Sequence, residues 1–254
     1  DIGPVHINFP FEKPLEPNSF TDEIEEKILL ESLADDYNHQ QTKIEANENQ
    51  KHVKLISNLL KKRVVGLITV GPGNFSNSFY DSLEIFSVKF SLPVFADASS
   101  SFRFKSNALS NLISNYDALL RSESFIKMFK PKFVLHFGRP LTSPKLEEYF
   151  SVCKPKGFTI NKFGDRLDPS RKFKIVKTDE ELFLKNLSNL VDEKQNYFSI
   201  GLKDLKYLDS QIEKIKPEIF SIAKKINEPG VLFDLIDSIP PNSNLMIGNS
   251  IPIR

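Results

Sequence analysis

Apolar and polar positions alternate along most of the chain in the manner of β-α units. From Lys62 onward, short apolar runs are separated by stretches with helical periodicity, an order typical of a parallel sheet with helices between its strands. The apolar runs predict strands at Val64–Val70, Pro93–Phe95, Phe133–Phe137, Gly157–Ile160 and Phe173–Val176. The stretches between them predict helices at Ser76–Phe90, Ser122–Phe129, Ser143–Val152 and Asp179–Val191. We therefore predict an α/β fold with a Rossmann-like doubly wound parallel sheet, whose ligand crevice lies at the carboxyl ends of the strands.

The segments on either side of this series follow other patterns. Residues 1–18 are rich in proline and predict one strand followed by an extended linker. Residues 19–61 predict two helices separated by a polar stretch. Residues 203–228 carry apolar side chains at spacings of three and four, which predicts a long amphipathic helix with a kink or a break at Pro217. A short helix from Pro229 and a strand at Asn244–Gly248 are expected to follow.

Composition excludes several classes of protein. Hydrophobic residues make up 40% and charged residues 26%, which is close to the globular average. No apolar run is long enough for a membrane span and the first residues lack a secretory signal, so a cytoplasmic protein is expected. Cys153 is the only cysteine, which excludes intrachain disulfides and cysteine zinc clusters. The histidines do not recur at metal-ligand spacing, and His136 lies in an apolar run as a core histidine would, so no metal site is expected.

The net charge of +1 hides an uneven distribution. Residues 1–60 carry 5 Lys or Arg against 12 Asp or Glu, a balance of −7, whereas residues 121–177 carry 14 against 5, a balance of +9. The basic part could attract an anion, but it contains no nucleic-acid-binding motif, and most of its lysines are expected to solvate helix faces. We therefore expect no nucleic acid partner.

Two places in the predicted sheet could hold an anion. Gly71-Pro72-Gly73 follows a strand and precedes a helix, as a nucleotide-binding loop would, but the third glycine of the dinucleotide pattern is replaced by Ser76. Gly71 and Gly73 are therefore a weak candidate nucleotide loop, and a tight strand-to-helix turn is the favoured interpretation.

Arg139 and Arg166 are the second candidate anion site. Each arginine follows a predicted strand, and a doubly wound sheet would bring both to the same crevice at the carboxyl edge. The favoured alternative is that each arginine pairs with a nearby acid, such as Asp165 or Asp168 for Arg166.

Several segments together resemble one family. Gly3–Pro10 resembles the segment with which thiamine-diphosphate enzymes close their pyrimidine-binding domain, and residues 11–15 continue it with a Pro-Phe-x-x-Pro-Leu ending. Gly248–Arg254 is similar to the Gly-Asn-Ser-x-x-x-Arg motif that opens the diphosphate-binding domain of the 2-succinyl-5-enolpyruvyl-6-hydroxy-3-cyclohexene-1-carboxylate (SEPHCHC) synthase branch. Gly164–Pro169 resembles a Gly-Arg-Leu-Asp-Pro turn of that branch's central domain, with Asp165 inserted.

The resemblance implies a division of the chain and a chemistry. Residues 1–18 would close the pyrimidine-binding domain, 19–61 would be linker helices, 62–228 the central Rossmann-like domain, and 229–254 the start of the diphosphate-binding domain. The family decarboxylates 2-oxoglutarate on thiamine diphosphate and Mg²⁺ and adds the succinyl carbanion equivalent to isochorismate, in menaquinone or phylloquinone biosynthesis. Its members work as homo-oligomers, dimers or tetramers. The family motif places substrate contacts at Asn249, Ser250 and Arg254, and the planar guanidinium of Arg254 suits a substrate carboxylate.

The resemblance also implies that this chain cannot catalyse the reaction alone. The glutamate that protonates the cofactor's aminopyrimidine ring is expected before Asp1, and the motif that binds the magnesium diphosphate is expected after Arg254. The chain by itself is thus expected to contain no catalytic residue and to bind no cofactor. Two alternatives stay open: another thiamine-diphosphate decarboxylase or carboligase, and an anion- or nucleotide-binding regulatory module.

Overall fold

The computed structural model describes five parts of the 254-residue chain: residues 46–103, 109–163, 172–191, 201–222 and 228–246. The chain divides into two compact units, residues 1–40 and 41–254, and all described residues belong to the second. The strand and linker predicted for residues 1–18 lie outside the described residues.

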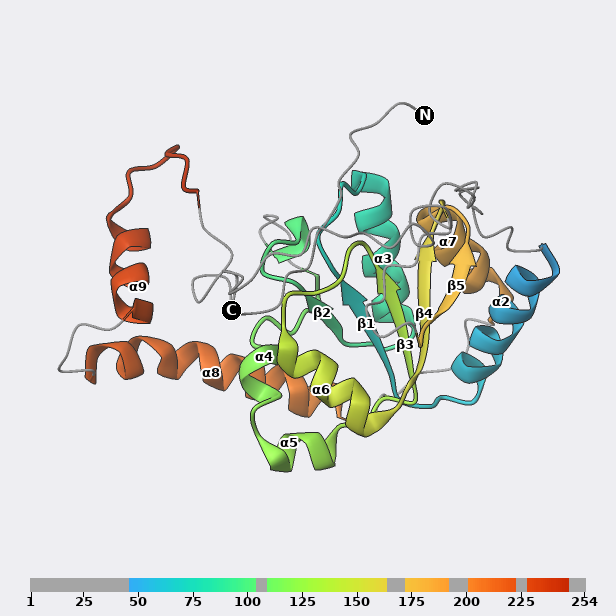
Figure 1. Cartoon of the computed structure of the whole chain (residues 1–254), viewed down its shortest axis with the longest axis horizontal. Coiled ribbons are helices and arrows are strands. Elements are labelled where there is room, and N and C mark those ends of the chain that lie inside the picture. The colour runs from blue at the N-terminus through green and yellow to red at the C-terminus, as the bar shows by residue number, and fades with distance from the viewer. Residues whose placement is uncertain (1–45, 104–108, 164–171, 192–200, 223–227, 247–254) are drawn as a thin grey trace, which may run out of the picture. The chain divides into compact units, whose positions relative to one another are not determined.

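A parallel sheet forms the centre of the described part (Figure 1). Its five strands run in the order β2-β1-β3-β4-β5, and every neighbouring pair is parallel. The strands are β1 (Gly66–Val70), β2 (Val94–Ala96), β3 (Phe133–Phe137), β4 (Lys156–Asn161) and β5 (Lys174–Lys177). From β1 the chain first moves outward to β2 and then returns to build β3, β4 and β5 on the other side, so the winding direction reverses between β1 and β3. The predicted α/β fold with a doubly wound parallel sheet is confirmed.

Helices cover both faces of the sheet because successive strand residues point to opposite faces. On one face, α2 (Ala46–Lys61), α3 (Asn77–Lys89) and α7 (Glu180–Leu190) pack on side chains such as Ile68. On the other face, α4 (Tyr116–Leu119), α5 (Glu123–Met128) and α6 (Pro144–Cys153) pack on side chains such as Leu67. Both strand residues are completely buried, as the near-continuous apolar runs of the sequence require for strands covered on two sides.

Side-chain caps fix where four of these helices begin. In each, an oxygen of the N-cap residue accepts a hydrogen bond from a backbone N–H of the first turn, which has no partner inside the helix. The caps are Ser76 for α3, Ser122 for α5, Ser143 for α6 and Asp179 for α7. All four stand at the first residue of a predicted helix, so the loops after β1, β3 and β5 end at defined points near the carboxyl edge of the sheet.

The helix predicted over residues 203–228 was expected to kink or break at Pro217. Helix α8 (Leu202–Ile222) runs through Pro217 without a break, and α9 (Glu228–Ser238) follows as a separate helix. The first half of α8 joins the core through the completely buried Leu205. Within the described residues no helix has the length and apolar character needed to cross a bilayer.

The prediction of a strand at Asn244–Gly248 is wrong for residues 244–246, which have no regular structure. Residues 247 and 248 lie outside the described part. A strand needs a hydrogen-bonding neighbour, and these three residues pair with none of the described strands. Met246, for example, is 97% exposed.

Candidate functional site

The carboxyl edge of the sheet holds a cavity of about 570 Å³. It is lined by the loops after β1, β3, β4 and β5, and so includes the place where the winding direction reverses. In open α/β sheets this is the usual position of a ligand crevice. The cavity therefore lies where the sequence predicted one.

Backbone contacts between β1 and β3 form the floor of this edge. The N–H of Gly71 donates to the carbonyl of Phe137 over 2.9 Å, and the N–H of Arg139 donates to the carbonyl of Pro72 over 2.8 Å. A Cβ atom on Gly71 would lie 1.6 Å from the carbonyl oxygen of Arg139, so no other residue fits there without moving the backbone. Gly71 is thus required by the close approach of the two loops.

Aromatic packing explains the second glycine of this loop. A Cβ atom on Gly73 would lie 2.6 Å from the ring of Phe75. That ring stacks on Phe79 at 4.9 Å and meets Phe102 edge-on at 5.3 Å, which anchors the loop to the core. The structure thus gives Gly71 and Gly73 a role in chain packing. Nucleotide binding by the loop stays a prediction.

Two cations line the cavity. The side chain of Arg139 is exposed, and its guanidinium makes no hydrogen bond or ion pair among the described residues. The ammonium group of Lys162 lies 4.8 Å from the centre of the Phe163 ring, a cation–π contact that leaves its hydrogen-bond donors available. Both positive groups can therefore turn toward an anion in the cavity.

Three carboxylates at the start of α7 also line the cavity: Asp179, Glu180 and Glu181. Asp179 caps the helix by accepting from the N–H of Leu182 over 2.9 Å. Glu181 accepts from Lys185 and from the hydroxyl of Ser78, and these hydrogen bonds hold the pKa of Glu181 below its ordinary value. Both carboxylates are thus engaged in holding α7 in place.

Glu180 differs from its two neighbours. Burial raises the pKa of its carboxyl, and the nearby charge of Asp179 raises it further. Lys162 acts in the opposite direction and lies close enough to attract the ionised form. The raised pKa means that Glu180 takes up a proton more readily than an ordinary glutamate.

Asp97 ties a second pair of loops together at the same edge. It follows β2 directly, is completely buried, and accepts hydrogen bonds from the backbone N–H and hydroxyl of Ser99. Its other oxygen accepts from the N–H of Thr142 over 2.6 Å and from the Thr142 hydroxyl over 3.0 Å. Burial alone would raise the pKa of Asp97, but these four hydrogen bonds lower it overall. Asp97 is a functional residue that was not predicted from the sequence, although an acid directly after an apolar strand was a usable signal.

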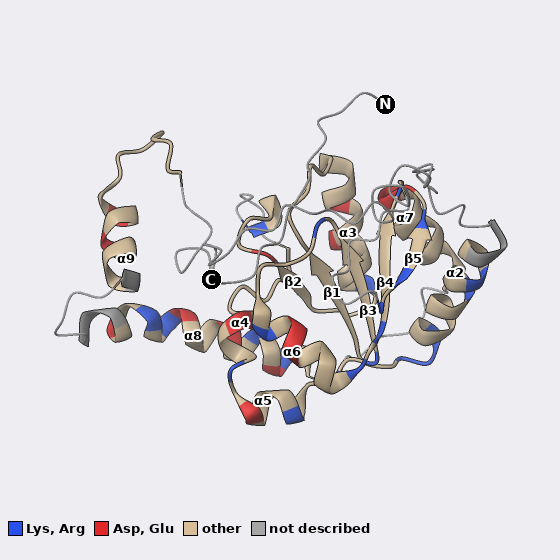
Figure 2. Cartoon of the chain, in the orientation of Figure 1, with Lys and Arg blue, Asp and Glu red and all other residues tan. Residues whose placement is uncertain are grey.

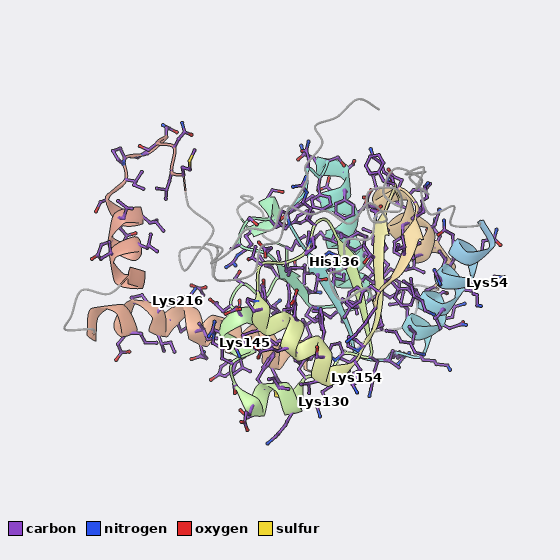
Figure 3. All side chains as sticks on the ribbon, in the orientation of Figure 1. Lys54, Lys130, His136, Lys145, Lys154 and Lys216 are labelled. Carbon is purple, nitrogen blue, oxygen red and sulfur yellow. The ribbon has the colours of Figure 1, made fainter. Side chains whose placement is uncertain are left out.

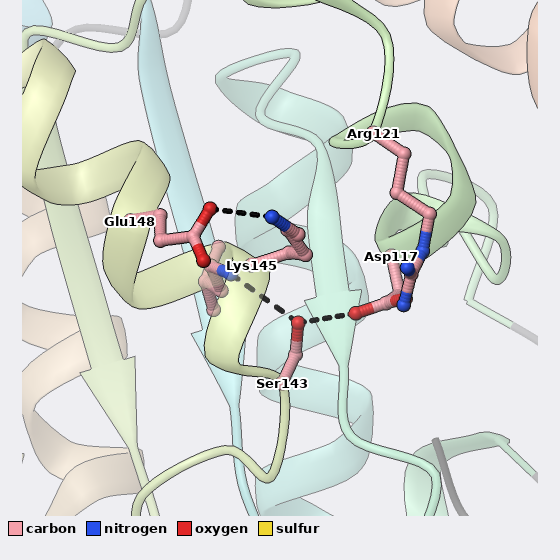
Figure 4. A network of polar contacts seen from close by, with 6 residues as sticks. Asp117, Arg121, Ser143, Lys145 and Glu148 are labelled. Carbon is pink, nitrogen blue, oxygen red and sulfur yellow. Dashed lines mark hydrogen bonds and ion pairs between the residues drawn. The ribbon is translucent and has the colours of Figure 1, made fainter. Parts of the chain in front are cut away.

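A polar network beside it fixes the start of α6 (Figure 4). The hydroxyl of Ser143 donates to Asp117 over 2.5 Å and accepts from the N–H of Leu146 over 3.2 Å. Asp117 also pairs with Arg121 at 2.9 Å. The serine hydroxyl faces an arginine-paired carboxylate, so the network lacks the general base that a nucleophilic serine needs. Its role is to join α6 to α4.

The candidate residues from the sequence can be placed only in part. Arg139 lines the cavity, whereas Arg166, Asn249, Ser250 and Arg254 lie outside the described residues. The convergence of Arg139 with Arg166 and the substrate contacts of the other three therefore stay predictions.

His136 is only 4% exposed in the middle of β3, and its Nδ1 lies 2.9 Å from the hydroxyl oxygen of Thr69 (Figure 3). It is the core histidine that the apolar run predicted.

The described residues do not fit a magnesium diphosphate group. They contain no group of three His, Cys, Asp or Glu side chains that could hold a metal ion. Two of the three carboxylates in the cavity, Asp179 and Glu181, are already engaged in α7.

The known proteins that are similar to this chain share one name. No protein-family model matches the chain. SEPHCHC synthases from Bacillus cytotoxicus and Synechocystis are each 24% identical to it, over 258 and 269 aligned residues that include 100% of the chain. The chain is similar in sequence to SEPHCHC synthases over its whole length. The synthase from Staphylococcus saprophyticus is 28% identical over 99% of the chain, and that from Haloquadratum walsbyi is 31% identical over 64% of it.

These similarities confirm the resemblance that the sequence motifs suggested. The chain spans 42% of the Bacillus cytotoxicus synthase and 44% of the Synechocystis synthase, so it corresponds to less than half of each relative.

Proposed function

We propose that the chain is the central part of a thiamine-diphosphate-dependent SEPHCHC synthase. The observation that carries the proposal is similarity over the whole chain to several proteins that all bear this name. The reaction would be decarboxylation of 2-oxoglutarate and addition of the succinyl carbanion equivalent to isochorismate, in menaquinone or phylloquinone biosynthesis. The parallel sheet supports the proposal because it matches the central Rossmann-like domain implied by the resemblance.

Within that protein, the chain would hold substrate and contribute structure. Thiamine diphosphate with Mg²⁺, held by groups outside the described residues, would supply the electron sink for decarboxylation. Asn249, Ser250 and Arg254 are proposed to contact substrate, with the Arg254 guanidinium forming a bidentate pair with a carboxylate. The protein is proposed to work as a homo-oligomer in the cytoplasm.

The proposal is tested with the complete natural protein that contains this chain. It should form product only when 2-oxoglutarate, isochorismate, thiamine diphosphate and Mg²⁺ are all present, and Arg254→Ala should raise the KM for a carboxylate substrate. The 254-residue chain alone should form none. Turnover of another acceptor in place of isochorismate would instead support the alternative of a different thiamine-diphosphate carboligase.

A second function has support from the carboxyl-edge cavity. Arg139 and Lys162 both reach this cavity, and no described carboxylate engages Arg139. The site is proposed to bind a small carboxylate or phosphate, with Arg166 as a further ligand, and to regulate the complete enzyme.

Titration calorimetry of the chain with aromatic carboxylates should show binding that Arg139→Ala and Arg166→Ala together abolish. Arg121→Ala is the control, because its guanidinium already pairs with Asp117. Equal affinity in all variants would remove the two arginines from the site, and tight binding of an adenine nucleotide instead would favour the nucleotide loop at Gly71.

A further inference from the structure

The amino edge of the sheet, opposite the cavity, is strongly basic. A Lys-x-Lys segment stands at the start of three of its strands. These segments are Lys130-Pro131-Lys132 at β3, Lys154-Pro155-Lys156 at β4 and Lys172-Phe173-Lys174 at β5, and the loop into β1 contains Lys61-Lys62-Arg63. The nine basic residues of these segments are called the basic rim, and none of the four segments contains Asp or Glu.

Strand pairing brings the segments of the rim together. The N–H of Lys132 donates to Val65 over 2.7 Å, and the N–H of Lys156 donates to Lys132 over 2.9 Å. Lys174 is the register partner of Phe158 on β4. Because neighbouring strands lie about 4.8 Å apart, residues from segments distant in sequence form one continuous row. Figure 2 shows the basic residues in blue along the loops that lead into the strands, and Figure 3 labels Lys130 and Lys154 at this edge.

Five lysines of the rim have no carboxylate partner within the described part of the chain, although Glu147 lines the hollow beside Lys154. Lys130, Lys132, Lys154, Lys156 and Lys174 are all exposed, and none of their side chains forms a hydrogen bond or ion pair there. Elsewhere in the described residues, lysines on α6, α7 and α8 do pair with a glutamate on the same helix. These five lysines therefore keep a positive potential at this edge, unlike the three lysines paired on α6, α7 and α8.

Helix stability accounts for only part of the rim. Helices α2, α5 and α6 end at this edge, and a cation near a helix C-terminus is favoured by the partial negative charge there. This explains residues such as Lys130 and Lys154. Lys132, Lys156 and Lys174 instead begin strands or directly precede them, and no helix end explains them.

Apolar side chains stand beside the cations. Met128 at the end of α5 is 52% exposed, and Val152 at the end of α6 is 64% exposed. Between α6 and the entry to β5 lies a hollow of about 530 Å³, whose lining includes Phe150, Phe173 and Lys154. The edge thus combines positive charge with exposed aliphatic groups.

We propose that the basic rim docks the protein peripherally on an anionic phospholipid bilayer. The lysines lie against the head groups, and Met128 and Val152 enter the interface between head groups and acyl chains. A bilayer fits better than nucleic acid, because single-stranded binding uses exposed aromatic rings on which bases stack. Beside the rim, Phe129 and Phe133 are buried, and Phe150 and Phe173 in the hollow are partly buried. Lysine rather than arginine dominates the row, and lysine acts as a point charge that does not require one fixed phosphate geometry.

The test measures sedimentation of the chain with vesicles of phosphatidylcholine alone and of phosphatidylcholine mixed with phosphatidylglycerol. The chain should bind only the mixed vesicles, and binding should disappear between about 0.05 and 0.5 M salt because screening shortens the reach of surface charges. A rim variant changes Lys130, Lys132, Lys154 and Lys156 to Gln. Each lysine at an anionic surface contributes about a fivefold factor in affinity, so the four changes together should weaken binding by roughly 600-fold, and by at least about 25-fold when only two of them lie against head groups.

The matched control removes the same charge elsewhere. It changes Lys51, Lys54, Lys203 and Lys206 to Gln, four exposed lysines on α2 and α8. Its affinity should stay within about twofold of the parent chain, since these lysines lie outside the rim. Circular dichroism establishes that each variant is folded. If the rim variant fails to fold, the Met128→Ser, Val152→Ser chain tests the same surface without a charge change and should bind several-fold more weakly.

Three results would overturn the proposal. An equal loss of vesicle affinity in the control variant would show that net charge alone attracts the chain to the vesicles. Equal binding to neutral vesicles would remove the role of the lysines. Displacement of the chain from anionic vesicles by a short single-stranded RNA at lower concentration than by phosphatidylglycerol vesicles would make nucleic acid the preferred partner.

Discussion

Asp97 offers the sharpest test of how the carboxyl edge is held together. Its carboxylate accepts four hydrogen bonds, two from Ser99 and two from Thr142, with no exposure to solvent. In Asp97→Asn the side chain keeps its shape, but one oxygen becomes an NH₂ group. The hydroxyls of Ser99 and Thr142 can rotate to accept from that group, whereas their backbone N–H groups cannot. Whichever way the amide turns, one partly buried N–H loses its acceptor.

The size of the effect follows from these contacts. A buried donor without an acceptor costs about 1–3 kcal/mol, and turning the other charge-assisted bonds into neutral ones costs about 1 kcal/mol more. We expect a loss of about 3 kcal/mol in the free energy of unfolding, which lowers the Tm of a domain of this size by about 6–12 °C. The substitution creates no cavity, so hydrogen bonding alone is tested.

Urea unfolding and thermal melting of the chain measure the change. Asp81→Asn is the control, because Asp81 is exposed on α3 and makes no hydrogen bond or ion pair among the described residues. A loss below about 0.5 kcal/mol at Asp97, comparable with an ordinary surface substitution, would refute the reasoning.

The pH dependence gives an independent check. The pKa of Asp97 is lower in the folded chain than its ordinary value of 3.8, so its contribution is complete above that value and is lost as the pH falls through the folded pKa. The difference between the parent chain and Asp97→Asn should therefore stay constant from about pH 8 to pH 5 and narrow below about pH 4.

Four further substitutions test other positions. Gly71→Ala places a Cβ atom 1.6 Å from the Arg139 carbonyl oxygen and should cost more than about 4 kcal/mol in urea unfolding. Gly201→Ala, with φ +105° and open space around it, should cost only about 1 to 2 kcal/mol. Asn115→Ala removes the amide that binds two carboxylates of α8, so hydrogen exchange should speed up in α8 and not in the sheet. Glu180→Gln should raise the Tm at pH 7 and not at pH 4, because a raised folded pKa makes ionisation unfavourable to folding only above the ordinary value of 4.5.

The fold could be predicted because its signals are local. Strands covered on both faces need near-continuous apolar runs, and the runs at Val64–Val70 and Phe133–Phe137 contain β1 and β3. Helix starts were visible for the same reason, since Ser143 and Asp179 cap α6 and α7 through a backbone N–H only three residues away. At Pro217 the alternative of two helices is wrong, because α8 continues through this proline, which a helix interior can hold at the cost of one backbone hydrogen bond.

The two edges of the sheet could not be predicted in the same way. Asp97 and Thr142 are 45 positions apart, and only the parallel pairing through β1 brings the loops after β2 and β3 together. The segments at Lys132, Lys156 and Lys174 looked like separate solvated lysines in the sequence. Strand register places them in one row, and register depends on the whole sheet.

The two edges of the sheet differ in how many charges they expose, so the two proposed binding sites can be distinguished by experiment. At the carboxyl edge, short hydrogen bonds fix the loops and leave a small number of cations, such as Arg139 and Lys162, to meet a ligand. At the amino edge, no described carboxylate engages Lys130 or Lys156, and the attraction comes from many exposed charges acting together. Screening weakens a many-charge surface contact far more than a site with a few partly enclosed charges. Small-anion binding at the cavity should therefore survive a salt concentration that releases the chain from anionic vesicles.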